Sequence, residues 1–381
     1  MPSGSLTRVL PQNSSVVRRS SSEAVSGSPR AGSPVSLLKL KSALFASIFP
    51  FALLSCNGPV EKLGRGIVAP SVPVANTLVF AGDVMLTRDV GRRIRESHDT
   101  ALPFRNIAPY LSSADLSFVN LESPFSKTGK RTQSGIIFNA DPANIAGLVL
   151  AGVDVASTAN NHARDCGAKG VEFTYSWLKS HGIQPVGTAL SAACTHQGIV
   201  VTRHGVRFGF LAYTYDQSNG NWHDNDERVA NIDSVVMRQD VASLRRRCDV
   251  VIVSMHNGVE YQRRSNVQQK EFAHAAIDAG ALLVIGHHPH VRQETESYRN
   301  GFIFYSLGNF VFDQYQRRET QWGEIAQVSF LGQTIDSIRL LPVQITRNGP
   351  ELRESFPETQ KATGDTRRPS SNESELLRTE T

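Results

Sequence analysis

The sequence predicts an α/β domain in which two sheets pack together with helices outside. Two observations support this fold class. Short β-branched or aromatic runs alternate with longer helical patterns early in the chain, and strands follow one another with fewer helices near its end. The chain has 381 residues, of which 40% are hydrophobic and 20% charged, so a large core can form.

The expected elements follow in chain order. Apolar runs rich in β-branched and aromatic residues predict strands at 77–82, 116–122, 153–159, 249–255, 281–286, 301–306, 324–330 and 334–341. Longer helical patterns predict helices at 86–97, 141–152, 167–182, 233–247 and 266–279. Asp141 is placed to cap the second helix and Gly182 to end the third. Residues 198–214 predict a hairpin that turns at His204 and Gly205.

Composition divides the chain into four parts. Residues 1–56 predict a signal or lipoprotein segment with a long N-terminal extension, and the Pro- and Gly-rich residues 57–76 predict a linker. Residues 77–350 fit one large domain. Residues 351–381 lack apolar periodicity and predict a disordered tail.

The first part carries a candidate lipid anchor. Lys39 and Lys41 precede an uncharged apolar stretch of about 13 residues that ends at Cys56, too short to span a bilayer but suited to a signal peptide. The ending LLSC resembles a bacterial lipobox, so we expect Cys56 to be lipidated and to hold the domain on a membrane of the cell envelope, outside the cytoplasm. The alternatives are an uncleaved anchor or a plain signal peptide.

Charge says little about the substrate. The net charge of +5 is mild, and part of it lies in the N-terminal segment. Basic and aromatic residues are not interleaved as they are in nucleic-acid-binding proteins. We therefore expect no nucleic-acid partner.

Polar side chains follow the predicted strands where each strand ends. Ligands bind at this edge of α/β sheets, because loops from several strands converge there. The residues in question are Asp83, Glu122, Asn161, His162, His256, His288 and His290.

Each of these residues, taken alone, has an ordinary structural explanation. Asp83 suits a helix cap, Asn161 suits a turn, and a lone His256 suits a core histidine. Together, carboxylate, amide and imidazole groups match a two-metal site for Mn²⁺, Fe²⁺ or Zn²⁺. No thiolate joins them, which argues against a structural zinc site.

The segment GHHPHV places three histidines close together. Pro289 stiffens the loop and excludes helix, so that His288 and His290 can project toward the same edge. His287 is expected to point elsewhere or to bond a neighbouring carbonyl. The pattern predicts that this cluster holds metal.

Six motifs occur in the order seen in the bacterial capsule-synthesis CapA family, which is associated with poly-γ-glutamate capsule. They are FAGDVMLTRDV, NLESPFS, STANNHARDCG, MHNGVEY, GHHPHV and FIFYSLGNFVFDQ. The resemblance covers about residues 77–345. Because the CapA family belongs to the calcineurin-like metallophosphoesterase superfamily, the resemblance extends to that superfamily. It implies a four-layer αββα sandwich of two mixed sheets, with a dinuclear metal site at the strand ends.

The resemblance also implies roles for single residues. The implied metal ligands are Asp83, Glu122, Asn161, His256, His288 and His290, of which Glu122 could bridge two ions. His162 matches the imidazole that protonates the leaving oxygen or steadies the transferred phosphoryl group.

The sequence departs from the superfamily pattern at three points. Met85 stands where a histidine is usual, and Glu122 replaces the usual bridging Asp, which leaves occupancy of one metal position open. Asn257 stands where relatives often carry Trp, beside Glu260 and Tyr261 of the expected substrate pocket.

Two functions remain open at this point. One is a metal-dependent hydrolase of phosphoester-like substrates at the cell envelope. The other is a non-catalytic metal- or polyanion-binding component of a polymer export machinery. A phosphoester and an anionic polymer both suit a cationic metal site, so site chemistry does not separate the two functions. Membrane capsule-synthesis proteins are expected as partners, and finding them would favour the polymer role.

Overall fold

The computed structural model describes residues 74–127, 136–215 and 226–357. The predicted signal segment with Cys56, most of the predicted linker and most of the predicted tail lie outside the described residues. Within the described ranges, no helix is both long enough and apolar enough to cross a membrane.

One sheet has eight strands and is mixed. Its order is β14-β13-β12-β1-β2-β3-β4, and β11 pairs with β1 beside this path. The strands are β1 (Ala75–Val84), β2 (Leu116–Leu121), β3 (Val155–Ser157), β4 (Gln184–Val186), β11 (Asn309–Val311), β12 (Trp322–Leu331), β13 (Thr334–Thr346) and β14 (Gly349–Leu352). The strands β1 to β4 run parallel, whereas β12, β13 and β14 pair antiparallel.

The second sheet has six strands in the order β5-β6-β7-β8-β10-β9. Its strands are β5 (Ile199–Arg203), β6 (Val206–Thr214), β7 (Val250–His256), β8 (Leu283–His287), β9 (Thr295–Tyr298) and β10 (Gly301–Phe304). The strands β6, β7, β8 and β10 run parallel, and an antiparallel strand flanks each end.

Two helices, α6 (Ser234–Leu244) and α7 (Val267–Ala279), begin at a residue whose side chain caps them. Asp233 accepts hydrogen bonds from the first turn of α6, and Asn266 forms a capping box with Gln269 at the start of α7. The α-helices are α1 (Arg88–Ser97), α2 (Ala108–Leu111), α3 (Ile145–Leu150), α4 (Gly167–Ser180), α5 (Ala192–Thr195), α6 (Ser234–Leu244) and α7 (Val267–Ala279). Short 3₁₀ turns lie at Leu102–Phe104, Pro142–Asn144 and Glu319–Gln321.

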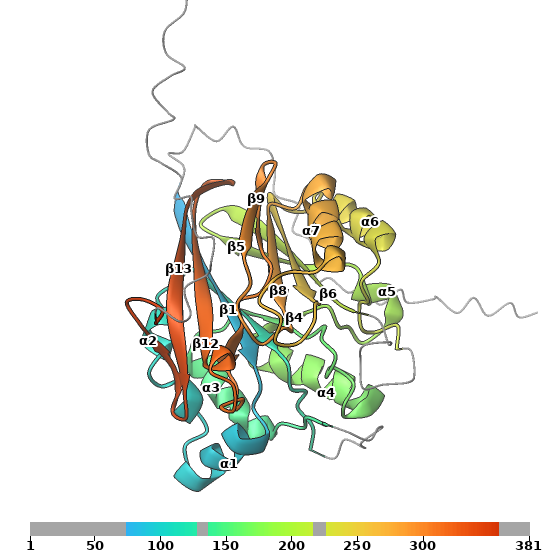
Figure 1. The fold of residues 1–381 in the computed structure, drawn as a ribbon. Coiled ribbons are helices and arrows are strands. Elements are labelled where there is room, and N and C mark those ends of the chain that lie inside the picture. The colour runs from blue at the N-terminus through green and yellow to red at the C-terminus, as the bar shows by residue number, and fades with distance from the viewer. Residues whose placement is uncertain (1–73, 128–135, 216–225, 358–381) are drawn as a thin grey trace, which may run out of the picture. The chain divides into compact units, whose positions relative to one another are not determined.

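Three buried clusters define four layers. Phe80, Phe118 and Phe210 belong to the cluster that joins the two sheets. The outer face of the first sheet packs on α1, α2 and α3, and the outer face of the second packs on α6 and α7. Figure 1 shows these two groups of helices on opposite sides of the strands. The expected αββα sandwich of two mixed sheets is confirmed.

Most predicted elements are present, with adjusted ends. The hairpin turns at His204 and Gly205, whose φ angles of 43° and 81° fit a two-residue hairpin turn. The strand predicted at 153–159 shortens to β3, because the residues after it turn into the loop that carries Asn161. The strands β4, β9, β11 and β14 were not predicted, since runs this short show no periodicity. Because β14 ends at Leu352, the folded part extends past the predicted boundary at residue 350.

Gly82 sets the close approach of β1 to the chain after β10. An added Cβ would fall well inside contact distance of the Gly308 carbonyl oxygen, a backbone atom that cannot rotate away. The adjacent amide of Asp83 donates to that same oxygen at 3.0 Å. We expect Gly82→Ala to lower the free energy of unfolding by about 2 kcal/mol or more, as overpacking does in tight sites.

Urea denaturation measures this loss. Gly91→Ala, in the middle of α1, is the control, because helix propensity favours alanine there and offsets a mild contact. Equal stability of wild type and Gly82→Ala would show that this packing is looser than described.

Candidate metal centre

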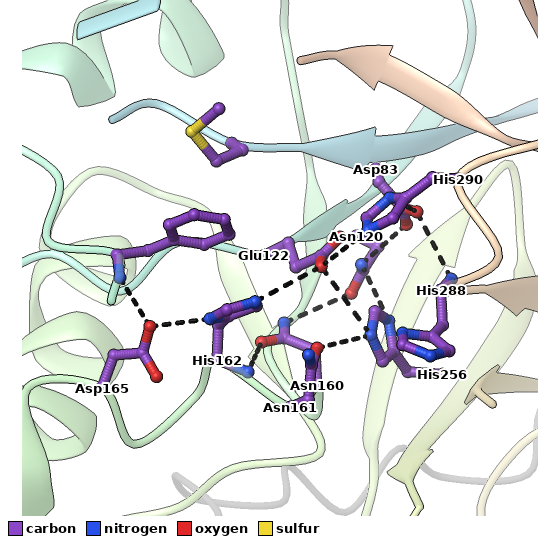
Figure 2. A network of polar contacts seen from close by, with 12 residues as sticks. Asp83, Asn120, Glu122, Asn160, Asn161, His162, Asp165, His256, His288 and His290 are labelled. Atoms are coloured by element: carbon purple, nitrogen blue, oxygen red, sulfur yellow. Dashed lines mark hydrogen bonds and ion pairs between the residues drawn. The ribbon is translucent and has the colours of Figure 1, made fainter. Parts of the chain in front are cut away.

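The seven residues predicted from strand ends come together in the structure. Asp83 lies in β1, Glu122 directly follows β2, and Asn161 and His162 lie in the loop after β3. His256 ends β7, and His288 and His290 follow β8. Figure 2 shows their side chains pointing toward one another from both sheets. None of the seven residues is more than 6% exposed.

Glu122 lies at the centre of this group. Its Oε1 atom is 3.6 Å from Nε2 of His290 and 4.0 Å from Nε2 of both His256 and His162. These separations are too long for hydrogen bonds. Within the described residues, both Glu122 oxygens lack a hydrogen-bond partner although the side chain is fully buried. A buried carboxylate without a partner is costly, so this arrangement fits a bound cation.

The donor atoms are spaced as ligands of a common ion. Two ligands that bind one ion at about 2.1 Å in a tetrahedral site lie roughly 3.4 Å apart. Nε2 of His290 is 3.6 Å from Oε1 of Glu122, and donor atoms of Asp83, Glu122 and His290 all lie within 4.8 Å of one another. The residues present therefore fit a divalent metal ion.

The pKa shifts of the two carboxylates at the centre also fit a bound cation. Burial raises the pKa of Glu122 well above its ordinary value, and His290 offsets this only in part. Burial also opposes ionisation of Asp83, but contacts with His287 and His290 hold the pKa of Asp83 well below its ordinary value. Asp83 is thus paired, whereas the charge of Glu122 is compensated only in part, and a divalent cation would complete that compensation.

The pKa values of the three imidazoles at the centre also differ from one another. Burial would lower the pKa of His290, but Glu122 and Asp83 raise it to about 9. Burial and His290 lower the pKa of His288 to about 3. Burial and His288 hold the pKa of His256 well below its ordinary value. His256 and His288 are therefore neutral at pH 7, the form that binds metal.

Asn120 and Asn309 orient the ligands, and Asn161, itself an implied ligand, contacts one of them. Asn120 donates to Oδ1 of Asp83 at 2.9 Å and lies 3.2 Å from Nδ1 of His256. Oδ1 of Asn309 is 3.0 Å from Nδ1 of His290, and Oδ1 of Asn161 is 2.9 Å from Nε2 of His256. Such outer contacts fix the orientation of metal-binding imidazoles. The sequence did not reveal Asn120 or Asn309, because each lies inside a strand.

His162 is held so that one ring nitrogen faces the cluster. Its Nδ1 is 2.7 Å from Oδ2 of Asp165, and the Phe138 amide donates to the same oxygen at 2.6 Å. The ring stacks on Phe138 at 3.9 Å. Asp165 therefore leaves Nε2 directed at Glu122 (Figure 2). In the sequence, Asp165 lies three residues after His162 within the motif STANNHARDCG, and this spacing indicates that the two side chains can contact each other.

Two residues differ from simple expectation. His287 does not turn toward a carbonyl, because alternation along β8 places it with Leu283 and Ile285 between the sheets. Its Nδ1 lies 3.3 Å from Oδ1 of Asp83. The sulfur of Met85 accepts hydrogen bonds from Thr87, so the position that usually supplies a histidine packs in the core instead.

Comparison with known proteins identifies relatives in capsule synthesis. The family model "Bacterial capsule synthesis protein PGA_cap" matches residues 77–314. The chain is 30% identical over 284 residues to the capsule biosynthesis protein CapA of Bacillus anthracis, covering 72% of this chain and 69% of the relative. It is 31% identical over 239 residues to the PGA biosynthesis protein CapA of Bacillus subtilis, covering 62% and 63%. The chain thus spans about two thirds of each relative's length.

A solved structure shows a weaker likeness. NAD nucleotidase of Haemophilus influenzae is similar at a TM-score of 0.45 and 12% identity, covering 75% of this chain and 54% of that one. No conclusion rests on a likeness at this level.

Proposed function

Because the chain belongs to the bacterial capsule synthesis protein PGA_cap family, we propose that it acts in capsule or poly-γ-glutamate synthesis or export. Within that role, the buried cluster serves as the metal centre of a phosphoesterase-like hydrolase. The observation that carries this proposal is the convergence of three imidazole Nε2 atoms on the unpaired Glu122 carboxylate.

The residues of the cluster have two roles, metal binding and proton donation. Asp83, Glu122, Asn161, His256, His288 and His290 would hold divalent ions, two if both positions fill, with Mn²⁺, Fe²⁺ or Zn²⁺ suited to this mixed set. When bound, such ions polarise phosphoryl oxygens and make a water acidic enough to act as nucleophile at neutral pH.

His162 would supply the proton. Asp165 accepts a hydrogen bond from Nδ1–H, so the imidazolium form of the ring carries its second proton on Nε2, and that proton is given to the leaving oxygen. Water adds to phosphorus as the bond to the leaving oxygen breaks, and His162 takes a proton back from solvent afterwards. Phe138 covers one face of the ring and keeps it in place.

Hydrolysis of aryl phosphates tests this proposal without a natural substrate. We expect the purified protein to cleave p-nitrophenyl phosphate or its bis-ester when loaded with one of several divalent ions. If it binds metal but is inert on both esters with every ion, the hydrolase proposal fails. The alternative, a non-catalytic component that binds metal or polyanion, would then stand.

Anchoring is the second part of the proposal. We expect lipid on Cys56 to hold the domain at the cell envelope, outside the cytoplasm, near membrane capsule-synthesis proteins. Cys56→Ser should move the protein to the soluble fraction or leave an unprocessed precursor, measured by fractionation and N-terminal mass. Identical partitioning and intact N-termini in wild type and variant would contradict the lipid anchor.

A further inference from the structure

Backbone strain gathers around the candidate metal centre. Of the non-glycine residues that the structure describes with a left-handed φ, some lie at turns or helix ends, namely His98, His204 and Arg299. The others are Arg88, which is the first residue of α1, and Tyr261, His288 and His290. Tyr261 donates its amide to Pro289 between the two histidines, at 2.8 Å. Strained residues persist where function requires their position, so Arg88 needs an explanation.

Arg88 is held rigidly while part of its charge faces solvent. Its Nη2 and Nε atoms both bond the carboxylate of Asp313, Nε at 3.1 Å, and that carboxylate also accepts from the Asp89 amide at 2.9 Å. The Asp313 side chain is 4% exposed, whereas that of Arg88 is 34% exposed. Within the described residues, Nη1 has no hydrogen-bond partner. The guanidinium therefore offers a fixed donor edge to solvent.

Arg88 is one aromatic ring away from the centre. Its guanidinium carbon lies 5.4 Å from the ring of Phe138 and 5.8 Å from that of Phe312. Phe138 stacks on His162 at 3.9 Å, and Phe312 lies 4.7 Å from the ring of His290. The same two rings thus contact the proton donor, an implied metal ligand and Arg88.

A second arginine lies nearby. The guanidinium of Arg317 is 4.3 Å from the ring of Tyr261, which in turn lies 6.4 Å from His290. Burial and the neighbouring carboxylate of Glu260 raise the pKa of Tyr261 to about 12, while Arg317 and Arg88 both oppose that rise, so both positive charges lie near its hydroxyl. Glu260 is exposed and its carboxylate contacts the Tyr261 side chain, so a negative charge lies beside these two arginines.

We propose that Arg88 is a specificity-determining residue that binds an anionic group of the substrate next to the group held at the metal centre. This inference rests on the proposed function for its setting. The recognised group is a carboxylate or a phosphate, because a guanidinium edge pairs with either. Asp313 is a positioning residue that keeps Arg88 aimed. Arg317 extends the same basic surface.

Binding by the full-length, metal-loaded protein tests this role apart from hydrolysis. Calorimetry would compare γ-linked tetraglutamate, its neutral α-carboxamide analogue, tripolyphosphate and orthophosphate. Arg88→Gln should lower the affinity for the ligand whose second anionic group contacts Arg88. The expected decrease is about 10- to 100-fold, the loss expected for a charged hydrogen bond. Orthophosphate should change less than about threefold. The ligand that loses affinity, tetraglutamate or tripolyphosphate, identifies the anion.

Matched variants guard against a folding defect. Arg92→Gln removes the same charge from the same helix, where Arg92 is 51% exposed and pairs with Asp89 and Glu96, and should change no affinity. Arg88→Lys keeps the charge without the planar fork and should give an intermediate loss. Unchanged affinity in Arg88→Gln, an equal loss for the neutral analogue or orthophosphate, or no binding by wild type would each overturn the role. Failure of hydrolysis alone would overturn only the proposed catalysis.

Discussion

Glu122→Gln should remove most of the metal from the protein and, with it, hydrolysis. The substitution keeps size and shape but deletes the charge on which His162, His256 and His290 converge. We expect metal affinity to fall by at least about 100-fold, because loss of a ligand should exceed the 10- to 100-fold typical of its outer contacts. Elemental analysis and metal titration of the purified variant measure this loss.

Without metal, Glu122→Gln should be more stable than wild type, although it binds metal less tightly. Because folding raises the pKa of Glu122, the stability that depends on its proton is complete below the ordinary carboxyl pKa and is lost as pH rises through the folded value. Glutamine carries no such charge, so the free energy of unfolding of Glu122→Gln should exceed that of metal-free wild type increasingly above the ordinary pKa. Asp226→Asn, a buried carboxylate paired with Arg228, is the control and should keep its metal. Equal metal content in wild type and Glu122→Gln would contradict the assignment.

His162→Ala should keep its metal and lose hydrolysis by about 10²–10⁴-fold, the usual contribution of a general acid. Asp165 holds Nδ1 of His162 so that Nε2 faces the cluster and can give a proton there, and the substitution leaves the six residues assigned to the metal in place. Steady-state rates on p-nitrophenyl phosphate, measured beside metal content, separate the two effects.

Neighbouring variants sharpen that test. Asn161→Ala should weaken metal binding, and excess metal should restore part of its activity, because Asn161 contacts His256. Asp165→Asn should keep metal and shift the pH dependence of the rate, since it changes which His162 nitrogen holds the proton. His181→Ala, at the end of α4, controls for loss of a histidine elsewhere. Full activity of His162→Ala would remove its assigned role even with the fold unchanged.

The sequence predicted which side chains lie together at the candidate metal centre, because each of them follows or ends an apolar run that indicates a buried strand. Asp83, Glu122 and His256 follow or end runs whose pattern alone indicates burial. Sheet order then decided which ends meet, and the structure places β1 to β3 and β7 to β8 so that their ends converge. The family resemblance supplied the two-sheet architecture that periodicity could not specify.

The remaining features depend on contacts between distant segments. Asn309 reaches His290 only because β11 pairs with β1, and a three-residue strand has no detectable period. Arg88 and Asp313 are far apart in sequence, and nothing near either residue indicates their pairing. Which way His287 points is set by alternation along β8, which places it between the sheets, rather than by the turn that follows.

Anomalous diffraction from crystals of the metal-loaded protein tests the metal centre most directly. Data collected at the absorption edge of the bound Mn, Fe or Zn locate the ion independently of activity. A metal centre at this site predicts a peak among Glu122, His290 and Asp83, whose donor atoms lie within 4.8 Å of one another, and its absence from Glu122→Gln crystals. Loaded crystals with no peak at these residues, or with a peak only elsewhere on the protein, would contradict it.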